Sequence, residues 1–221
     1  HQPRRQRQMC IRDRLKAAGA DRLMTVDLHT SQIQGFFDGP VDHLFALPLL
    51  AEHVASRVAT DQITVVSPDA GRVRVAERWT DVLGAPLAII HKRRDPDVPN
   101  QVRVFEVVGD VKNRVCVVVD DMIDTGGTIV KAAETLFENG AKDVIVAATH
   151  GILSDPARDR LQQSQISEVV VTDTLPIPPE RQFDKLTVLS IAPILATAIN
   201  EVFTDGSVSY THLRAHETRT Y

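Results

Sequence analysis

The chain has 221 residues, 43% of them hydrophobic, and a net charge of −4. This length allows one full domain, or one domain and part of another. No apolar run approaches the length of a membrane span and no secretory hydrophobic region is recognisable, so the sequence predicts no membrane partner.

The basic residues are concentrated at the two ends of the chain. Residues 1–14 contain five arginines and one aspartate, and residues 208–221 contain two arginines and one glutamate. The rest is therefore strongly acidic, which argues against nucleic acid as the main partner. Both end segments lack periodicity, and we expect them to be tails foreign to the fold. A basic nucleic-acid-binding arm is the alternative for residues 1–14.

The two cysteines, Cys10 and Cys116, lie far apart in the sequence. One is in the basic N-terminal tail and the other is in an apolar run. A structural disulfide is therefore not expected, which favours a reducing, cytoplasmic location.

Segments with strand and helix periodicity alternate along the chain from Leu15. This order predicts an α/β fold, in which a mostly parallel sheet is flanked by helices. The strands are predicted at residues 23–28, 63–66, 86–90, 101–108, 117–119, 143–148, 168–172 and 186–189. The helices are predicted at residues 15–20 (the last turn of one), 49–58, 72–83, 129–139, 156–166 and 191–203.

Polar residues follow two of the early strands. His29 comes after the first, within Asp27-Leu28-His29-Thr30, and Asp69 comes after the second, within Ser67-Pro68-Asp69. Open α/β sheets place their sites at the carboxyl ends of strands. By residue pattern alone, His29 is more typical of a structural histidine, and Asp69 of a helix cap.

Residues 91–100 form a highly charged segment broken by prolines, between two predicted strands. Such a segment is usually a solvated loop. It is long for a connection between strands, however, and long charged loops often act as lids.

Residues 117–128 are the most informative stretch. A buried strand is predicted to end at Asp120 and Asp121, and residues 124–128, Asp-Thr-Gly-Gly-Thr, precede a helix. The N–H groups at such a turn bind anions such as phosphate. The two acids would repel phosphate, but they can accept hydrogen bonds from sugar hydroxyls or bind a divalent cation. The stretch therefore predicts a site for a phosphorylated sugar and a metal.

Three other interpretations of this stretch fit the sequence less well. A Walker-type phosphate loop would need a lysine that the chain lacks. An aspartic protease would need a second Asp-Thr-Gly copy and has no helix at this place. An ordinary strand-to-helix turn is the remaining alternative, which the full twelve-residue pattern disfavours.

Four motifs resemble those of ribose-phosphate diphosphokinases, which have the type I phosphoribosyltransferase fold. They occur in the family's order, with near-family spacing, and the resemblance covers about residues 15–208. One departure is Arg72, where many relatives have a second glycine. The motifs are Asp27-Leu28-His29-Thr30, Ser67-Pro68-Asp69, Lys92-Arg93-Arg94 and Val119-Asp120-Asp121 through Thr128.

The resemblance implies transfer of the diphosphoryl group of ATP to the 1-hydroxyl of ribose 5-phosphate, for nucleotide biosynthesis. The products are 5-phosphoribosyl diphosphate and AMP, and the cofactor is Mg²⁺. Two other activities stay open: a phosphoribosyltransferase that uses a base, and a non-catalytic regulatory member of the same fold.

The resemblance also implies roles for individual residues. His29 and Asp69 are expected near the metal. Lys92 and Arg94, at the base of a mobile flap, are expected to stabilise the charge of the transition state. Asp120 and Asp121 are expected to engage the ribose hydroxyls, directly or through metal. The sugar phosphate is expected to bind Asp124, Thr125, Gly126, Gly127 and Thr128, with help from Arg94.

Relatives of this family have two similar domains and form hexamers. The resemblance therefore implies that residues 15–47 are the remnant of an N-terminal domain and that residues 48–207 are the C-terminal domain. A homo-oligomer is expected. Because the first domain supplies most nucleotide contacts, we expect this chain to bind ribose 5-phosphate weakly without turnover.

Overall fold

The computed structural model describes residues 4–94 and 103–204, which form two compact units. The first unit contains the described residues up to Ala46 together with those from Ala192 onward, and the second is Leu47–Ile191. The last helix, α6 (Ala192–Phe203), thus belongs to the first unit. The assignment of residues 15–47 and 48–207 to two domains of a longer protein stays a prediction.

The first unit contains a small parallel sheet. Strand β1 (Leu23–Val26) pairs with β2 (Val41–Leu44), which the sequence did not predict. Two polar side chains bind the backbone at the end of this sheet. The Asp27 carboxylate accepts from the Ala46 N–H, at 2.8 Å, and His43 Nε2 accepts from the Leu28 N–H, at 2.9 Å. The remaining elements are α1 (Arg4–Ala17) and the 3-10 helix η1 (Ser31–Phe36).

Helix α1 corrects the expected start of regular structure at Leu15. It begins at Arg4 and runs to Ala17, through most of residues 1–14. Arginine and glutamine are good helix formers, so this segment can be helical without an apolar periodicity. Whether residues 1–14 and 208–221 are foreign to the natural protein stays a prediction, and residues 205–221 lie outside the described part.

The second unit is built on a seven-stranded sheet with the order β5-β4-β3-β6-β7-β8-β9. Its pairs are parallel except β4 with β5, which is antiparallel, so the predicted α/β class is confirmed. The strands are β3 (Ile63–Ser67), β4 (Leu87–Arg94), β5 (Arg103–Val108), β6 (Val115–Ile123), β7 (Asp143–Gly151), β8 (Glu168–Thr172) and β9 (Leu186–Leu189).

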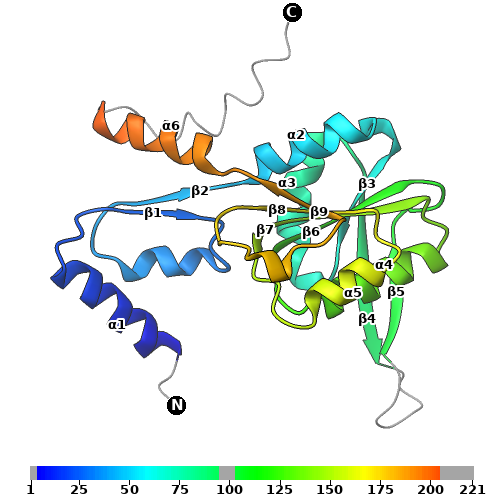
Figure 1. Ribbon diagram of the computed structural model, residues 1–221, viewed down its shortest axis with the longest axis horizontal. Coiled ribbons are helices and arrows are strands. Elements are labelled where there is room, and N and C mark those ends of the chain that lie inside the picture. The colour runs from blue at the N-terminus through cyan, green and yellow to red at the C-terminus, as the bar shows by residue number, and fades with distance from the viewer. Residues whose placement is uncertain (1–3, 95–102, 205–221) are drawn as a thin grey trace, which may run out of the picture. The chain divides into compact units, whose positions relative to one another are not determined.

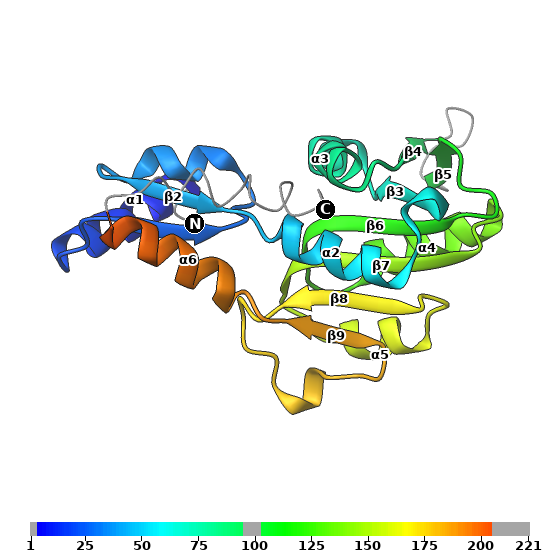
Figure 2. The same cartoon turned by 90° about the horizontal axis from the view of Figure 1, so that it is seen from above.

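Helices cover both faces of this sheet. Figure 1 shows α2 (Leu47–Arg57) and α3 (Val73–Leu83) on one side, and α4 (Gly127–Glu138) and α5 (Ala157–Gln163) on the other. Figure 2 shows the same sheet from above. Because both faces are covered, the central strands are apolar throughout, and every residue from Val115 to Val119 is buried. Among the described residues, no helix is both long and apolar enough to cross a bilayer.

Two of the strands that extend further than predicted do so through site residues. Strand β4 continues to Arg94, so Lys92 and Arg94 lie in the strand, paired with Phe105 and Arg103. The antiparallel partner satisfies the backbone N–H and C=O groups, so charged residues are accommodated there. Strand β6 continues through Asp120 and Asp121 to Ile123, because β7 pairs with it along this length.

Glu168, at the start of β8, connects α2 to the sheet. Its Oε1 lies 3.0 Å from His53 Nε2 and accepts from Thr187 Oγ1 at 2.6 Å, and the Arg57 guanidinium lies 3.4 Å away. Burial alone would raise the pKa of Glu168, but the hydrogen bonds from Thr187 and His53 and the charge of Arg57 outweigh it and lower the pKa. The folded protein therefore favours the ionised carboxylate.

Replacing Glu168 by alanine is expected to reduce the free energy of unfolding by about 1–3 kcal/mol at pH 7, because hydrogen-bonding groups lose a charged partner. Since the folded pKa lies below the ordinary value, this contribution is present above that value and is lost as the pH falls through the folded pKa. Urea unfolding followed by the fluorescence of Trp79 measures it.

The matched control is Glu134→Ala. Glu134 forms an exposed ion pair with Lys131 at 2.9 Å, and such pairs contribute about 0–1 kcal/mol. Equal losses for the two variants at pH 7 would contradict the structural role of Glu168.

Candidate functional site

The parallel pairing of β3 with β6 brings two predicted site segments to one edge of the sheet. Val66 is opposite Val118, so the chain after Ser67 and the acids Asp120 and Asp121 lie at the same carboxyl edge. Open α/β sheets bind ligands at this edge. The tertiary structure therefore brings the Ser67-Pro68-Asp69 segment close to the acidic pair.

Arg72 joins these two segments directly. Its Nε lies 3.1 Å from Asp120 Oδ1, and its Nη2 lies 2.7 Å from Asp121 Oδ1. The three side chains are 19%, 17% and 7% exposed, so the ion pairs are largely removed from water. The sequence predicted no role for Arg72. The signal that could have indicated one is a charged residue at a position where many relatives have glycine.

The environment of Asp120 favours its protonated form. Burial raises its pKa most, the hydrogen bond with the Asp121 side chain raises it further, and the charge of Asp121 adds to this effect. The Asp121 backbone N–H and the Arg72 guanidinium lower it. The net result is a pKa of about 7. Asp120 is thus poised to change protonation near neutral pH.

The turn after β6 has the geometry that the glycines predicted. Gly126 adopts φ +72°, a left-handed conformation, and α4 begins directly after it at Gly127. Asp124, Thr125 and Thr128 are exposed around the turn. The helix starts two residues earlier than expected at Ile129, so its first turn includes the N–H groups of Gly127 and Thr128. First-turn N–H groups lack partners within the helix and can bind an anion.

Arg160, from α5, lies beside this turn and was missed by the sequence reasoning. Its Nη1 donates to the Thr125 carbonyl oxygen at 3.1 Å. A Cβ atom at Gly127 would lie 3.4 Å from the same nitrogen. Arg160 therefore places a positive charge next to the start of α4. Nothing local in the sequence indicates this, because the contact spans 35 residues.

The four remaining predicted residues are not joined to this site by described contacts. Asp69 is half-buried, and its Oδ1 accepts from the Gly71 N–H at 2.8 Å, as a helix cap would. His29 is exposed in the first unit, so the predicted metal set is divided between the two units. The side chains of Lys92 and Arg94 lie outside the described part, and so do residues 95–102 of the predicted flap.

The described residues contain no group of three or more His, Cys, Asp or Glu side chains arranged to hold a metal ion. At this edge, the carboxylates of Asp120 and Asp121 lie together, and the Arg72 guanidinium already binds one oxygen of each acid. The pair as it stands therefore does not fit Mg²⁺.

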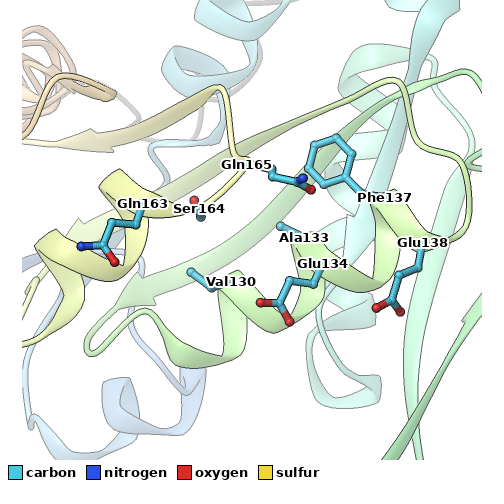
Figure 3. A pocket seen from close by; sticks show the side chains of 8 residues that line it. All are labelled: Val130, Ala133, Glu134, Phe137, Glu138, Gln163, Ser164 and Gln165. Atoms are coloured by element: carbon cyan, nitrogen blue, oxygen red, sulfur yellow. The ribbon is translucent and has the colours of Figure 1, made fainter.

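A pocket of about 470 Å³ lies between α4 and the end of α5, and it contains none of the predicted site residues (Figure 3). Two of its lining side chains are the carboxylates Glu134 and Glu138, which would repel a phosphate. The remaining lining residues are Val130, Ala133, Phe137, Gln163, Ser164 and Gln165. The strand ends, where the charged and hydrogen-bonding groups converge, are the stronger candidate.

Comparisons with known proteins identify the family of this chain. The family model of the phosphoribosyl synthetase-associated domain matches residues 89–213, more than half of the chain. The match runs past Val208, where the sequence predicted the resemblance to end. The chain is 70% identical over 199 residues to a ribose-phosphate pyrophosphokinase of Streptomyces avermitilis, which covers 90% of this chain and 61% of the relative.

Further relatives give the same result. The chain is 60% identical over 200 residues to a ribose-phosphate pyrophosphokinase of Mycobacterium bovis, with the same two shares covered. It is also similar to the crystal structure of phosphoribosylpyrophosphate synthetase from Mycobacterium smegmatis, with a TM-score of 0.82 and 56% identity over 90% of this chain and 64% of that one. The chain thus spans about three fifths of the length of these relatives.

Proposed function

Because this chain belongs to the phosphoribosyl synthetase-associated domain family, we propose that it is the sugar-phosphate-binding part of a ribose-phosphate pyrophosphokinase. The reaction transfers the diphosphoryl group of ATP to ribose 5-phosphate. The observation that carries this proposal is the carboxyl edge of the sheet, where two carboxylates precede a glycine turn and a helix start. A hydroxyl-bearing sugar and its phosphate need those two kinds of group, a few ångströms apart.

The acidic pair and the turn would bind opposite ends of the acceptor. Asp120 and Asp121 accept hydrogen bonds from ribose hydroxyls. The turn from Asp124 to Thr128 holds the 5-phosphate through backbone N–H groups and threonine hydroxyls, next to the Arg160 guanidinium. Fixing both ends leaves the 1-hydroxyl oriented toward the nucleotide.

The chemistry requires no protein nucleophile. The oxygen of the 1-hydroxyl forms a bond to the β-phosphorus of ATP, the bond from that phosphorus to the oxygen it shares with the α-phosphorus breaks, and AMP leaves. The hydroxyl loses its proton. Lys92 and Arg94 are the cations proposed to offset the charge that develops on the phosphate oxygens. His29 and Asp69 stay the proposed ligands of Mg²⁺, and the bound ion would supply positive charge that offsets the charge of the phosphates.

The relatives also separate the three candidate activities. The relatives named above are pyrophosphokinases, which favours this activity over a phosphoribosyltransferase that uses a base or a non-catalytic regulator. We propose a cytoplasmic homo-oligomer, in which residues 15–47 come from a first domain that supplies most nucleotide contacts.

Calorimetric titration of the 221-residue chain with ribose 5-phosphate tests the proposal. We expect saturable, weak binding, and weaker binding of ribose or inorganic phosphate alone, because each satisfies only half of the site. Thr128→Val should weaken binding roughly 3–10-fold through the loss of one hydroxyl donor to the phosphate.

Thr80→Val, a threonine on α3 whose hydroxyl donates to the Glu77 carbonyl, is the matched control and should bind as the unchanged chain does. Ribose 5-phosphate binding no tighter than ribose binding would overturn the proposed site. AMP formation from ATP and ribose 5-phosphate by this chain would instead overturn its proposed lack of turnover.

A further inference from the structure

We propose that Arg72 determines which class of ligand the Asp120–Asp121 pair accepts: the hydroxyl groups of a sugar rather than a divalent cation. This inference rests on the proposed function, in which the pair faces the ribose. The inference goes further than that function, because it assigns a role in ligand specificity to Arg72, which lies in the segment after β3. The observation behind it is the pair of ion contacts from one guanidinium to both acids.

Arg72 contacts one oxygen, Oδ1, of each of the two carboxylates. Asp120 Oδ1 receives Arg72 Nε at 3.1 Å and also the Asp121 backbone N–H at 2.8 Å. Asp121 Oδ1 forms an ion pair with Arg72 Nη2 at 2.7 Å. A carboxylate has about four lone-pair sites on its two oxygens, and the Arg72 contacts use one oxygen of each acid. Arg72 thus fixes the orientation of both acids.

The fixed positive charge separates the two ligand classes. A divalent cation bound between the acids would sit within a few ångströms of the guanidinium, in a place with little water to screen the repulsion. It would also receive a net charge no more negative than −1 from the three side chains, unless Arg72 moved away. A neutral hydroxyl meets no such repulsion and needs only one lone pair. With Arg72 in place, the pair therefore favours a diol.

A purely structural role for Arg72 makes a different prediction. Arg72 ends the 3-10 helix η3 (Ala70–Arg72) and directly precedes α3, so its ion pairs could simply fix the loop after β3. In that case, removal of its charge would lower stability and leave the ligand class unchanged. The affinity for a metal ion in the absence of sugar distinguishes the two roles.

The experiment is a titration of the 221-residue chain with Mn²⁺ alone, followed by electron paramagnetic resonance of the free ion. Mn²⁺ is the probe because carboxylate oxygens suit it. Arg72→Gln and Arg72→Ala should each bind Mn²⁺ at least roughly tenfold more tightly than the unchanged chain, because two buried carboxylates lose their counter-charge. Arg72→Lys keeps the positive charge and should bind Mn²⁺ as weakly as the unchanged chain.

The double variant Arg72→Gln with Asp121→Asn locates the new affinity. It should lose the gain, because only one carboxylate remains at the pair. Mn²⁺ affinity that stays unchanged in both the glutamine and the alanine variants, while Trp79 fluorescence reports a folded sheet, would overturn the role of Arg72. A gain that survives Asp121→Asn would overturn it too.

Titration of the same variants with ribose 5-phosphate separates this inference from the proposed function. If Arg72 orients the diol acceptors, the glutamine variant should bind the sugar more weakly and Mn²⁺ more tightly. Failure of the unchanged chain to bind ribose 5-phosphate would count against the proposed function alone, because the Mn²⁺ measurement involves no sugar.

Discussion

Replacement of Gly126 by valine is expected to lower the affinity for ribose 5-phosphate roughly a hundredfold, because the two first-turn N–H groups of α4 lose their alignment with the phosphate. Gly126 has φ +72°, and its added Cβ would lie 3.4 Å from Leu161 Cγ. A β-branched side chain is strained in this conformation, and its methyl groups would meet α5. The turn must therefore open, which separates the groups that would hold the phosphate.

The matched control for this prediction is Gly84→Val. Gly84 ends α3 with φ +62°, and an added Cβ there would meet no atom within 4 Å. Both variants are expected to lose about 1–3 kcal/mol of stability from backbone strain. Only the Gly126 variant should lose sugar-phosphate binding. Equal affinities in calorimetric titration of the two variants would contradict the role of the turn.

Replacement of Asp120 by asparagine is expected to change how the stability of the fold depends on pH. The pKa of Asp120 is about 7 in the fold, above its ordinary value of 3.8. Between these pH values the folded protein keeps a proton that the unfolded chain releases, so this group lowers the free energy of unfolding as the pH rises. Asparagine cannot ionise, so the variant should not show this decrease in the free energy of unfolding with rising pH.

The size of this effect on stability follows from the size of the pKa shift of Asp120. Between pH 4 and pH 8, the free energy of unfolding of Asp120→Asn should rise by up to about 4 kcal/mol relative to that of the unchanged chain. The reason is that each pKa unit corresponds to about 1.4 kcal/mol. Urea unfolding followed by Trp79, the single tryptophan, measures this difference. Glu138→Gln, which replaces an exposed carboxylate on α4, is the control and should follow the unchanged chain. Parallel stability profiles for Asp120→Asn and the unchanged chain would rule out the raised pKa.

The same acidic pair shows how a stability cost accompanies the proposed function. Two adjacent carboxylates in a largely buried position oppose folding, and one guanidinium offsets only part of that opposition. A sugar that donates hydrogen bonds to them would reduce the cost further. This is the expected pattern for a binding site, where local stability is lower so that the groups can meet a ligand.

Local patterns in the sequence determined the parts of this protein that need only neighbours along the chain. The valines from Val117 to Val119 specify a strand buried on both faces, and the glycines at 126 and 127 specify a turn before a helix. Strands β8 and β9 begin and end where their apolar runs predicted. In each case the reason is periodicity or conformational freedom, which a short segment carries by itself.

Only the tertiary structure decided the features that depend on distant partners. Strand β4 extends to Arg94 because β5 pairs with it, and β2 forms because β1 lies alongside. Arg72 and Arg160 reach the site from a neighbouring loop and helix, and no local pattern distinguishes them from solvated arginines. The sequence predicted the acids and the turn, but their charge state depends on burial and on Arg72. Such contacts join residues far apart in the chain, so the fold must form before they exist.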